Sequence, residues 1–103
     1  MENNFEIVIF PLAQADMEEI FNYISNNLKN KIAAGKLIND FKRTIEMIRL
    51  FPESFPLINN EYVNDKNIRK VSLKNYIIFY RIVNYEIQII RVLHGLQKYE
   101  KLL

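Results

Sequence analysis

Five cationic side chains that could hold a phosphate or an acidic partner lie between residues 69 and 94. Arg69 and Lys70 begin an apolar run, Arg81 ends it, and Arg91 interrupts the next one. A guanidinium stays charged inside a protein, so it must be paired or solvated. We therefore expect Arg81 and Arg91 to open onto a groove or an acidic partner. Together with Lys74, these residues could form a phosphate-binding surface on adjacent strands.

A single histidine is the candidate for acid–base chemistry. Histidine is the side chain that titrates closest to neutral pH, and His94 ends the last apolar run of the chain. A histidine at the end of a strand is more often structural or solvated than catalytic, so catalysis by His94 is the minority interpretation. Tyr76 and Tyr80 could stack on bases, but tyrosines on a half-buried strand usually belong to the core.

The composition excludes several classes of site and of protein. The 103 residues contain no cysteine and one histidine, so disulfides, thiolate-bound metals and histidine-rich metal sites are not expected. Two glycines cannot build a loop that cradles phosphates, and we expect neither a cofactor nor a metal. No apolar run approaches the roughly 20 residues that span a bilayer, and the acidic start MENNFE is not typical of a signal peptide. We therefore expect a cytoplasmic protein that does not enter a membrane.

The net charge of +2 conceals an asymmetry between the two parts of the chain. Residues 1–65 carry 6 Lys/Arg and 10 Asp/Glu, a net charge of −4, whereas residues 66–103 carry 8 Lys/Arg and 2 Asp/Glu, a net charge of +6. A basic sheet beside an acidic helical part could attract an anionic partner. Ordinary solvated lysines on strands would produce the same pattern, and both interpretations stay open.

The basic residues lie in a stretch, from Ile68 to Gly95, that predicts three antiparallel strands. Its two breaks, Lys74-Asn75 and Asn84-Tyr85, are too short for anything but hairpin turns. Alternation along each strand then defines two faces. In the middle strand it separates Tyr76, Ile78, Tyr80 and Ile82 from Ile77, Phe79, Arg81 and Val83, and in the last strand it separates Ile87, Ile89, Arg91 and Leu93 from Gln88, Ile90 and Val92. Because both faces are largely apolar, these strands belong in the middle of a sheet that is covered on at least one side.

The first half of the chain predicts one strand followed by two helices. Phe5–Phe10 is a short apolar run, and Pro11 follows it where the first turn of a helix tolerates proline. Helical spacing of apolar residues extends from Leu12 to about Leu28, breaks at several asparagines, and resumes until Phe51-Pro52. We interpret these apolar stripes as core and not as cofactor-binding surfaces.

The remaining segments are a loop and a short tail. Glu53–Asn67 has no hydrophobic period, so we expect a loop with a short extended piece at Leu57-Ile58. Gly95–Leu103 is a polar tail whose apolar residues have roughly helical spacing. The predicted fold is a single α+β domain over residues 1–103. Its elements follow the order β-α-α-β-β-β, with one twisted, mostly antiparallel sheet packed against a two-helix hairpin.

Several stretches together resemble the RelE/ParE superfamily of toxins. They are F-P-L-A-Q-A-D-M-E-E-I-F-N-Y-I in the first helix, the F-P pair that ends the second helix, R-K-V-S-L-K-N-Y-I-I-F-Y-R from Arg69 to Arg81, and I-I-R-V-L-H-G from Ile89 to Gly95. The resemblance covers nearly the whole chain and includes the order of its elements. It implies the growth-inhibiting toxin of a bacterial type II toxin–antitoxin system, of the kind associated with plasmid stabilisation. A cognate antitoxin protein would neutralise it in a hetero-oligomeric complex.

The resemblance implies one of two targets. RelE-like members cut mRNA on the ribosome, whereas ParE-like members inhibit DNA gyrase without cutting RNA. The R-V-L-H-G ending is more similar to the ParE branch, although Leu96-Gln97-Lys98 replaces the arginine pair and acid that usually follow there. We therefore favour a gyrase inhibitor, with a ribosome-dependent endoribonuclease as the alternative. A third possibility is an inactive relative that acts as a protein-interaction domain.

Only the ribonuclease alternative requires catalytic residues. Cleavage through the 2′-hydroxyl needs a base, a cationic clamp for the phosphate and an acid for the leaving oxygen. Arg69 could be the clamp and His94 the acid, but no base is evident, because Glu53 and Glu61 lie in the loop. Whether the chain is an enzyme stays open. The residues that we expect to bind the target are Arg69, Lys70, Tyr80, Arg81, Arg91 and His94.

The antitoxin should cover apolar surface around the helical hairpin and the sheet edge. Its expected contribution is a helix, with or without an added strand. The expectation rests on apolar helical residues that exceed what so small a domain readily buries, among them Met17, Phe21, Leu37 and Phe41.

Overall fold

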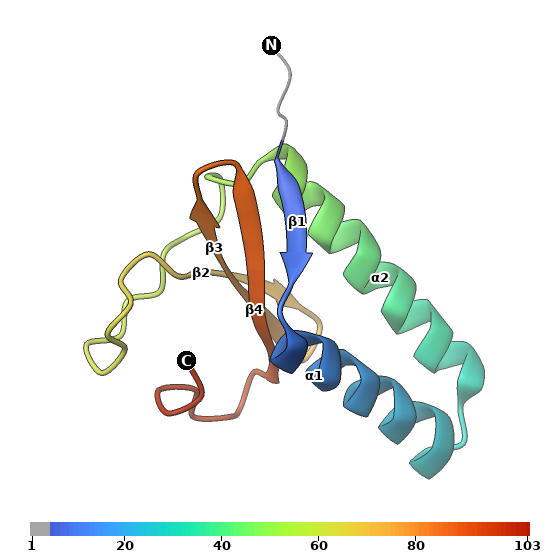
Figure 1. Cartoon of the computed structure of the whole chain (residues 1–103). Helices are drawn as coiled ribbons and strands as arrows, with labels where there is room; N and C mark the ends of the chain where they lie inside the picture. Colours follow the sequence, from blue (N-terminus) through green and yellow to red (C-terminus); the bar gives the residue numbers. More distant parts are fainter. Residues whose placement is uncertain (1–4) are drawn as a thin grey trace.

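Two helices pack against one face of a four-stranded sheet in the computed structural model, which describes residues 5–103 (Figure 1). The elements in chain order are β1 (Glu6–Ile9), α1 (Pro11–Asn22), the π-helical turn η1 (Tyr23–Asn27), α2 (Lys31–Leu50), β2 (Arg69–Leu73), β3 (Tyr76–Val83) and β4 (Glu86–His94). The strand order is β1-β4-β3-β2, with β1 parallel to β4 and the other neighbours antiparallel. The predicted α+β class, element order and mostly antiparallel sheet are therefore confirmed.

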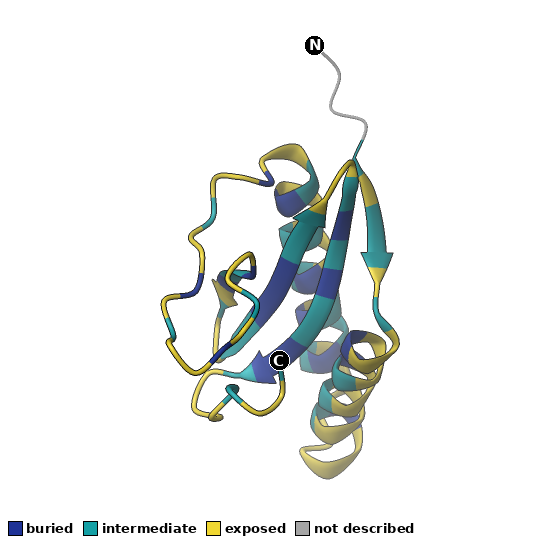
Figure 2. Cartoon of the chain, turned by 60° about the vertical axis from the view of Figure 1, so that its left-hand side comes forward, coloured by how far each residue is buried: buried dark blue, intermediate teal, exposed yellow. Residues whose placement is uncertain are grey.

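Both faces of the sheet are covered, where the apolar character of its strands predicted covering on at least one side. The larger core lies between the sheet and the two helices, and its buried members are Ala13, Met17, Leu37, Phe41, Ile48, Val71, Ile78, Tyr80, Ile87, Ile89 and Val92. The smaller core lies between the other face and the irregular segments that follow α2 and β4; it contains Ile58, Val63, Ile68, Phe79 and Leu93. Figure 2 shows the buried residues running along β3 and β4, the two central strands.

The two predicted hairpin turns are present. Lys74-Asn75 connects β2 to β3, and Asn84-Tyr85 connects β3 to β4. The first residue of each turn has a left-handed backbone, with φ of 55° at Lys74 and 56° at Asn84. Asparagine tolerates this conformation better than lysine does. The Lys74 ammonium pairs with the Asp40 carboxylate of α2 at 3.0 Å, which ties the turn to the helix.

A β-bulge makes the predicted face assignment wrong for the end of β4. Phe79 stands opposite Arg91 and Tyr80 opposite Ile89, so Ile90 is an extra residue in β4. One extra residue reverses the alternation beyond it. Val92 therefore joins Ile87 and Ile89 in the helix-side core instead of facing away from them.

The junction between the two helices is more elaborate than the predicted break. The α-helical pattern ends at Asn22, earlier than the predicted Leu28, and continues as the π-helical turn η1. Lys29 then has a left-handed φ of 52°, and the Asn30 side chain accepts a hydrogen bond from the amide of Ala33 at the start of α2. Within residues 5–103, no helix is long and apolar enough to cross a membrane.

The loop and the tail both pack on the smaller core. Leu57 forms an isolated antiparallel bridge with Arg69, which confirms the predicted extended piece in the loop. The tail forms turns and no regular helix. The ring centroids of Tyr99 and Phe79 lie 4.9 Å apart, and Leu103 also packs on the smaller core. Leu96, by contrast, is exposed to solvent.

Candidate functional site

Arg69 is bound to the segment that follows α2. Its Nη1 donates hydrogen bonds to the carbonyl oxygens of Phe55 at 2.6 Å and Glu53 at 3.3 Å. These contacts bind one nitrogen of the half-buried guanidinium to backbone oxygens. Arg69 therefore holds the 53–55 segment against the edge of the sheet.

Tyr80 is fully buried and cannot stack on a base, so its assignment to the binding surface is corrected. It stands beside Arg69 in the register of β2 and β3. Its hydroxyl donates to the Pro52 carbonyl oxygen at 2.6 Å, and the Phe55 ring packs edge-on against it. Burial raises the pKa of Tyr80 to about 12, against the opposing effect of the nearby Arg69 charge. The residue anchors the segment after α2 to the core.

Arg81 finds an acidic partner within the chain. Its Nη1 donates to Asp65 Oδ2 at 2.8 Å and its Nε to Gln88 Oε1 at 2.6 Å, and the guanidinium carbon lies 5.7 Å from the centre of the Phe10 ring. A hydrogen bond from the amide of Asn67, together with the Arg81 charge, holds the pKa of Asp65 below its usual range.

Arg91 makes the most complete ion pair of the strand arginines. Its Nε and Nη2 donate to the two carboxylate oxygens of Asp16 in α1, both at 2.8 Å. The same carboxylate accepts the Val92 amide at 2.9 Å, and the pair raises the pKa of Arg91. Both side chains are only 14% exposed. Asp16 was not singled out in the sequence, because an acid early in a helix is usually explained by the helix dipole.

His94 lies beside Tyr76 of the neighbouring strand. Its ring meets that of Tyr76 edge-on, with centroids 5.7 Å apart, and its Nδ1 accepts the Leu96 amide at 3.2 Å. The His94 amide donates to Gln97 Oε1 at 2.9 Å. These contacts close the end of β4.

The predicted basic residues do not share one surface. Arg69 stands in register with Tyr80, which faces the helices, whereas Lys70 stands in register with Phe79, which faces the smaller core. His94, on β4, is in register with Tyr76 of β3. Arg69 and His94 are therefore two strands apart across the sheet and four residues apart along it. At about 3.3 Å per residue and 4.8 Å per strand, the Cα atoms of Arg69 and His94 are separated by roughly 16 Å.

Two grooves flank α1. One, of about 470 Å³, lies between the helices and is largely apolar; it is lined by Ile9, Gln14, Met17, Glu18, Phe21, Asn22, Ile38, Phe41, Lys42 and Ile45. We call it the interhelical groove. The other, of about 800 Å³, lies between α1 and the end of β4, and Glu19, Tyr76, Arg91 and His94 are among its lining residues.

One of the four apolar residues named for the antitoxin surface is exposed, and other exposed apolar residues of the helical part include Leu12, Leu28, Ile32 and Met47. Met17, Leu37 and Phe41 are buried in the helix-side core. Phe21 is 37% exposed and lines the interhelical groove. The expectation that all four residues form an uncovered face is therefore wrong for three of them, because the helical hairpin packs closely on the sheet.

Comparisons with known proteins identify the family. A solved structure described as the chromosomal ParDE TA system from P. aeruginosa has a TM-score of 0.75 at 18% sequence identity, covering 90% of this chain and 98% of that chain. No curated protein matches the sequence significantly. The family model described as the ParE toxin of type II toxin–antitoxin system, parDE, matches residues 7–99. That match extends from β1 to beyond the end of β4, so the chain belongs to the ParE toxin family, the ParE branch of the RelE/ParE superfamily.

Proposed function

We propose that this ParE-family toxin inhibits bacterial growth by binding DNA gyrase, and that it does so in the cytoplasm without cutting RNA. The family match supports the ParE branch over the RelE branch. The observation that carries the proposal further is the separation of the two candidate catalytic residues.

Arg69 and His94 are poorly placed to act on one phosphodiester. Their Cα atoms lie roughly 16 Å apart, so the two functional groups would meet at one phosphate only if both side chains extended towards each other, and an acid and a cationic clamp must converge within a few ångströms. In addition, Arg69 already donates to two backbone carbonyl oxygens, and those hydrogen bonds would have to break before it could hold a phosphate. Both facts favour inhibition by binding over RNA cleavage.

A supercoiling assay with purified gyrase and purified toxin tests the proposal. We expect the toxin to inhibit supercoiling and the preformed toxin–antitoxin complex to leave it unchanged. In cells, induction should activate the DNA damage response before translation stops. Unimpaired supercoiling together with early cleavage of mRNA would contradict the proposal and support the ribonuclease alternative.

Replacement of His94 by glutamine separates the two mechanisms at a single residue. A general acid contributes about 10²–10⁴-fold to a rate, so its loss would make a ribonuclease toxin tolerable. In a gyrase inhibitor, His94 closes the end of β4 and packs on Tyr76, and glutamine keeps one acceptor there. We expect His94→Gln to retain growth inhibition at full induction. Loss of toxicity in a folded His94→Gln protein, with protection of cellular mRNA, would contradict this expectation.

The antitoxin partner that family membership indicates is proposed to fill the interhelical groove. The groove presents apolar side chains from both helices and from Ile9 at the end of β1. An amphipathic helix laid along such a groove buries apolar residues at helical spacing. Gln14, Glu18 and Lys42 at the rim could bind its polar face.

A further inference from the structure

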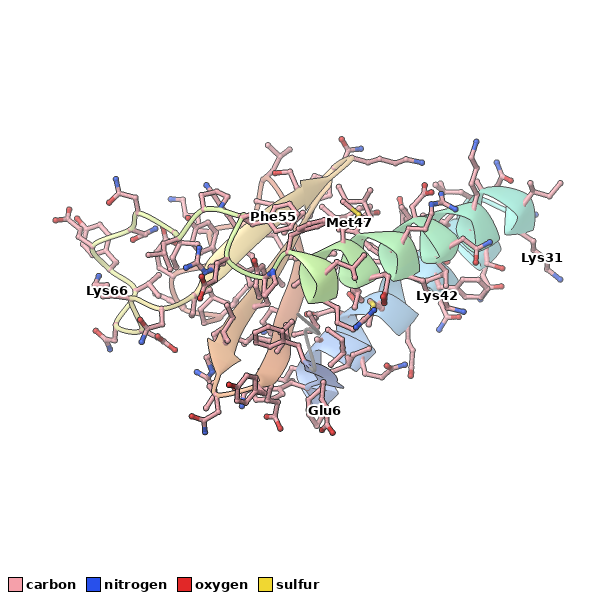
Figure 3. All side chains as sticks on the ribbon, turned by 90° about the horizontal axis from the view of Figure 1, so that it is seen from above. Glu6, Lys31, Lys42, Met47, Phe55 and Lys66 are labelled. Carbon is pink, nitrogen blue, oxygen red and sulfur yellow. The ribbon has the colours of Figure 1, made fainter. Side chains whose placement is uncertain are left out.

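The tip of the helical hairpin, residues 23–32, projects away from the sheet (Figure 1). Figure 3 shows Lys31 at one extreme of the molecule and Lys66, in the loop, at the opposite extreme. Every residue from Asn26 to Ile32 is exposed. The tip is thus the part of the helical layer that a large partner would meet first.

The tip is basic although the helical part of the chain is acidic. Between Glu19 and Asp40 the sequence contains Lys29, Lys31 and Lys36 and no acidic residue. Residues 1–65 as a whole carry a net charge of −4. A local concentration of lysines on an acidic domain is complementary to an acidic surface on a partner.

Apolar side chains accompany the lysines. Ile32 is 86% exposed and Leu28 is 57% exposed. Ile32 also lines a shallow groove of about 540 Å³, together with Ser25, Asn26, Lys29, Asn30 and Lys31. Apolar residues surrounded by polar and charged ones are typical of protein–protein interfaces.

The backbone of the tip adopts two uncommon conformations. In η1 the Leu28 amide donates to the Tyr23 carbonyl oxygen at 3.1 Å, an i to i+5 bond that places Leu28 one turn above Tyr23. Such π-helical turns occur frequently at functional sites. Lys29 follows with a left-handed backbone, where glycine or asparagine is usual at a helix end. The chain therefore keeps a lysine at a position that disfavours one.

We propose that the hairpin tip docks on an acidic surface of the protein that the toxin inhibits. In the complex, Ile32 and Leu28 enter an apolar depression, while Lys29 and Lys31 face carboxylates. The inference rests on the proposed function, in which that protein is gyrase. It assigns the target to a part of the toxin distinct from the interhelical groove.

The chemistry of the tip favours a protein over a nucleic acid or a lipid surface. Phosphate binding needs cations and amides but gains nothing from an exposed isoleucine. Insertion into a bilayer would bury the amides of Asn26, Asn27 and Asn30 beside the apolar side chains, at a cost that a protein partner avoids through hydrogen bonds.

The antitoxin can fill the interhelical groove without covering the tip. On α1 the groove reaches Asn22, next to the tip and six residues before Leu28. On α2 its lining residue nearest the tip is Ile38. Ile32 lies six residues before it, about 9 Å farther along the helix. Target binding and antitoxin binding are therefore separable by substitution.

The test uses matched pairs of full-length variants. Ile32→Ser removes an exposed apolar side chain at the tip, and Leu96→Ser removes one of nearly equal exposure, 88%, in the tail. Lys29→Glu with Lys31→Glu reverses two charges at the tip, and Lys98→Glu with Lys101→Glu makes the same change in the tail. Each variant is measured for binding to immobilised gyrase, inhibition of supercoiling, growth inhibition, and affinity for the cognate antitoxin.

We expect both tip variants to bind gyrase at least about tenfold more weakly than the wild-type toxin, as at an interface anchor, and the tail variants to change by less than about twofold. Antitoxin affinity should stay within about twofold of wild type in all four. Tip variants that inhibit gyrase and growth like the wild type would overturn the inference and leave the proposed function intact. A parallel loss of antitoxin affinity would also overturn it, because the tip would then belong to the antitoxin interface.

If gyrase is not the target of the toxin, the same variants give a different pattern of results. If the wild-type toxin does not affect gyrase but Ile32→Ser abolishes growth inhibition, gyrase is the wrong target and the tip still binds a protein target. Binding of the wild-type toxin to phosphatidylglycerol vesicles or to duplex DNA, lost in Ile32→Ser, would overturn the choice of a protein partner. Circular dichroism of the tip variants should match that of the wild type, since the substituted side chains are exposed.

Discussion

At the scale of single residues, the sequence shows that the strand arginines need partners, but it does not show which residues those partners are. That Arg81 and Arg91 need a partner follows from their charge and their strand positions. The partners themselves are Asp65, 16 residues away, and Asp16, 75 residues away. Such pairs are made by tertiary structure, so they could not be identified from local pattern. They also occupy guanidiniums that we had expected to face an external target.

Tyr80 allows a prediction about alkaline stability. Its pKa is raised to about 12 in the folded protein, from an ordinary value of 10.0. The folded state therefore keeps this proton more tightly than the unfolded state does. The resulting stabilisation is complete below pH 10 and is lost as the pH rises towards 12. Two pKa units correspond to roughly 2–3 kcal/mol.

Tyr80→Phe should remove this part of the pH dependence. Between pH 9 and 12, we expect the free energy of unfolding of the wild-type protein to fall by roughly 2–3 kcal/mol more than that of Tyr80→Phe. Denaturant titrations at each pH would measure the difference. Tyr62→Phe, at a tyrosine exposed in the loop, is the control and should behave like the wild type. Parallel curves for wild type and Tyr80→Phe would show that Tyr80 titrates normally.

At the scale of elements, the hydrophobic periods predicted both α-helices and all four strands that residues 5–103 form, and the short breaks between strands predicted both hairpin turns. The helical spacing of the tail was misleading, because the tail forms turns. Two irregularities were not predicted. The bulge at Ile90 shifts Val92 to the other face of β4, and the π-helical turn replaces the last turn of the first helix. Both insert one residue into a repeating pattern. Analysis by period assumes an unbroken register, so it cannot locate them.

The bulge has a consequence for how α1 docks on the sheet. β1 pairs with β4 only as far as Ile89, and beyond that point Asp16 of α1 accepts the Val92 amide and binds Arg91. A helix side chain thus takes the place of the missing strand. The Asp16–Arg91 pair is 14% exposed on each side, whereas the Asp65–Arg81 pair is 29% and 33% exposed.

Double-mutant cycles should distinguish these two ion pairs. With alanine substitutions in denaturant titrations, we expect a coupling energy of about 1–3 kcal/mol for Asp16 with Arg91. For Asp65 with Arg81, which is better solvated, we expect less than about 1 kcal/mol. Asp16→Ala alone should also destabilise the protein more than Asp65→Ala, because it leaves Arg91 poorly compensated near the core. Equal coupling energies would mean that Asp16 contributes no more than a surface partner.

At the scale of the whole molecule, the charge asymmetry of the sequence does not become one basic face. The cations of β2 and β3 alternate between the two covered faces, with Arg69 on the helix side and Lys70 and Arg81 on the other. Alternation alone indicates this division. Alternation does not predict the basic surface at the tip of the helical hairpin, because that surface depends on how the hairpin is arranged in space.

The arrangement separates the two proposed binding surfaces of the helical layer. Phe21 tests the surface proposed for the antitoxin. Phe21→Ala removes the partly exposed aromatic ring from the interhelical groove. A buried aromatic anchor is typically worth 2 kcal/mol or more at an interface, so we expect antitoxin affinity to fall by about 30-fold or more. Gyrase inhibition should persist, because the hairpin tip is unchanged. Tyr62→Ala, in the loop on the opposite face of the sheet, should leave both the antitoxin affinity and the inhibition of gyrase unchanged. In cells, the Phe21→Ala toxin should therefore inhibit growth even when the antitoxin is co-expressed, whereas full rescue by the antitoxin would show that the antitoxin binds elsewhere.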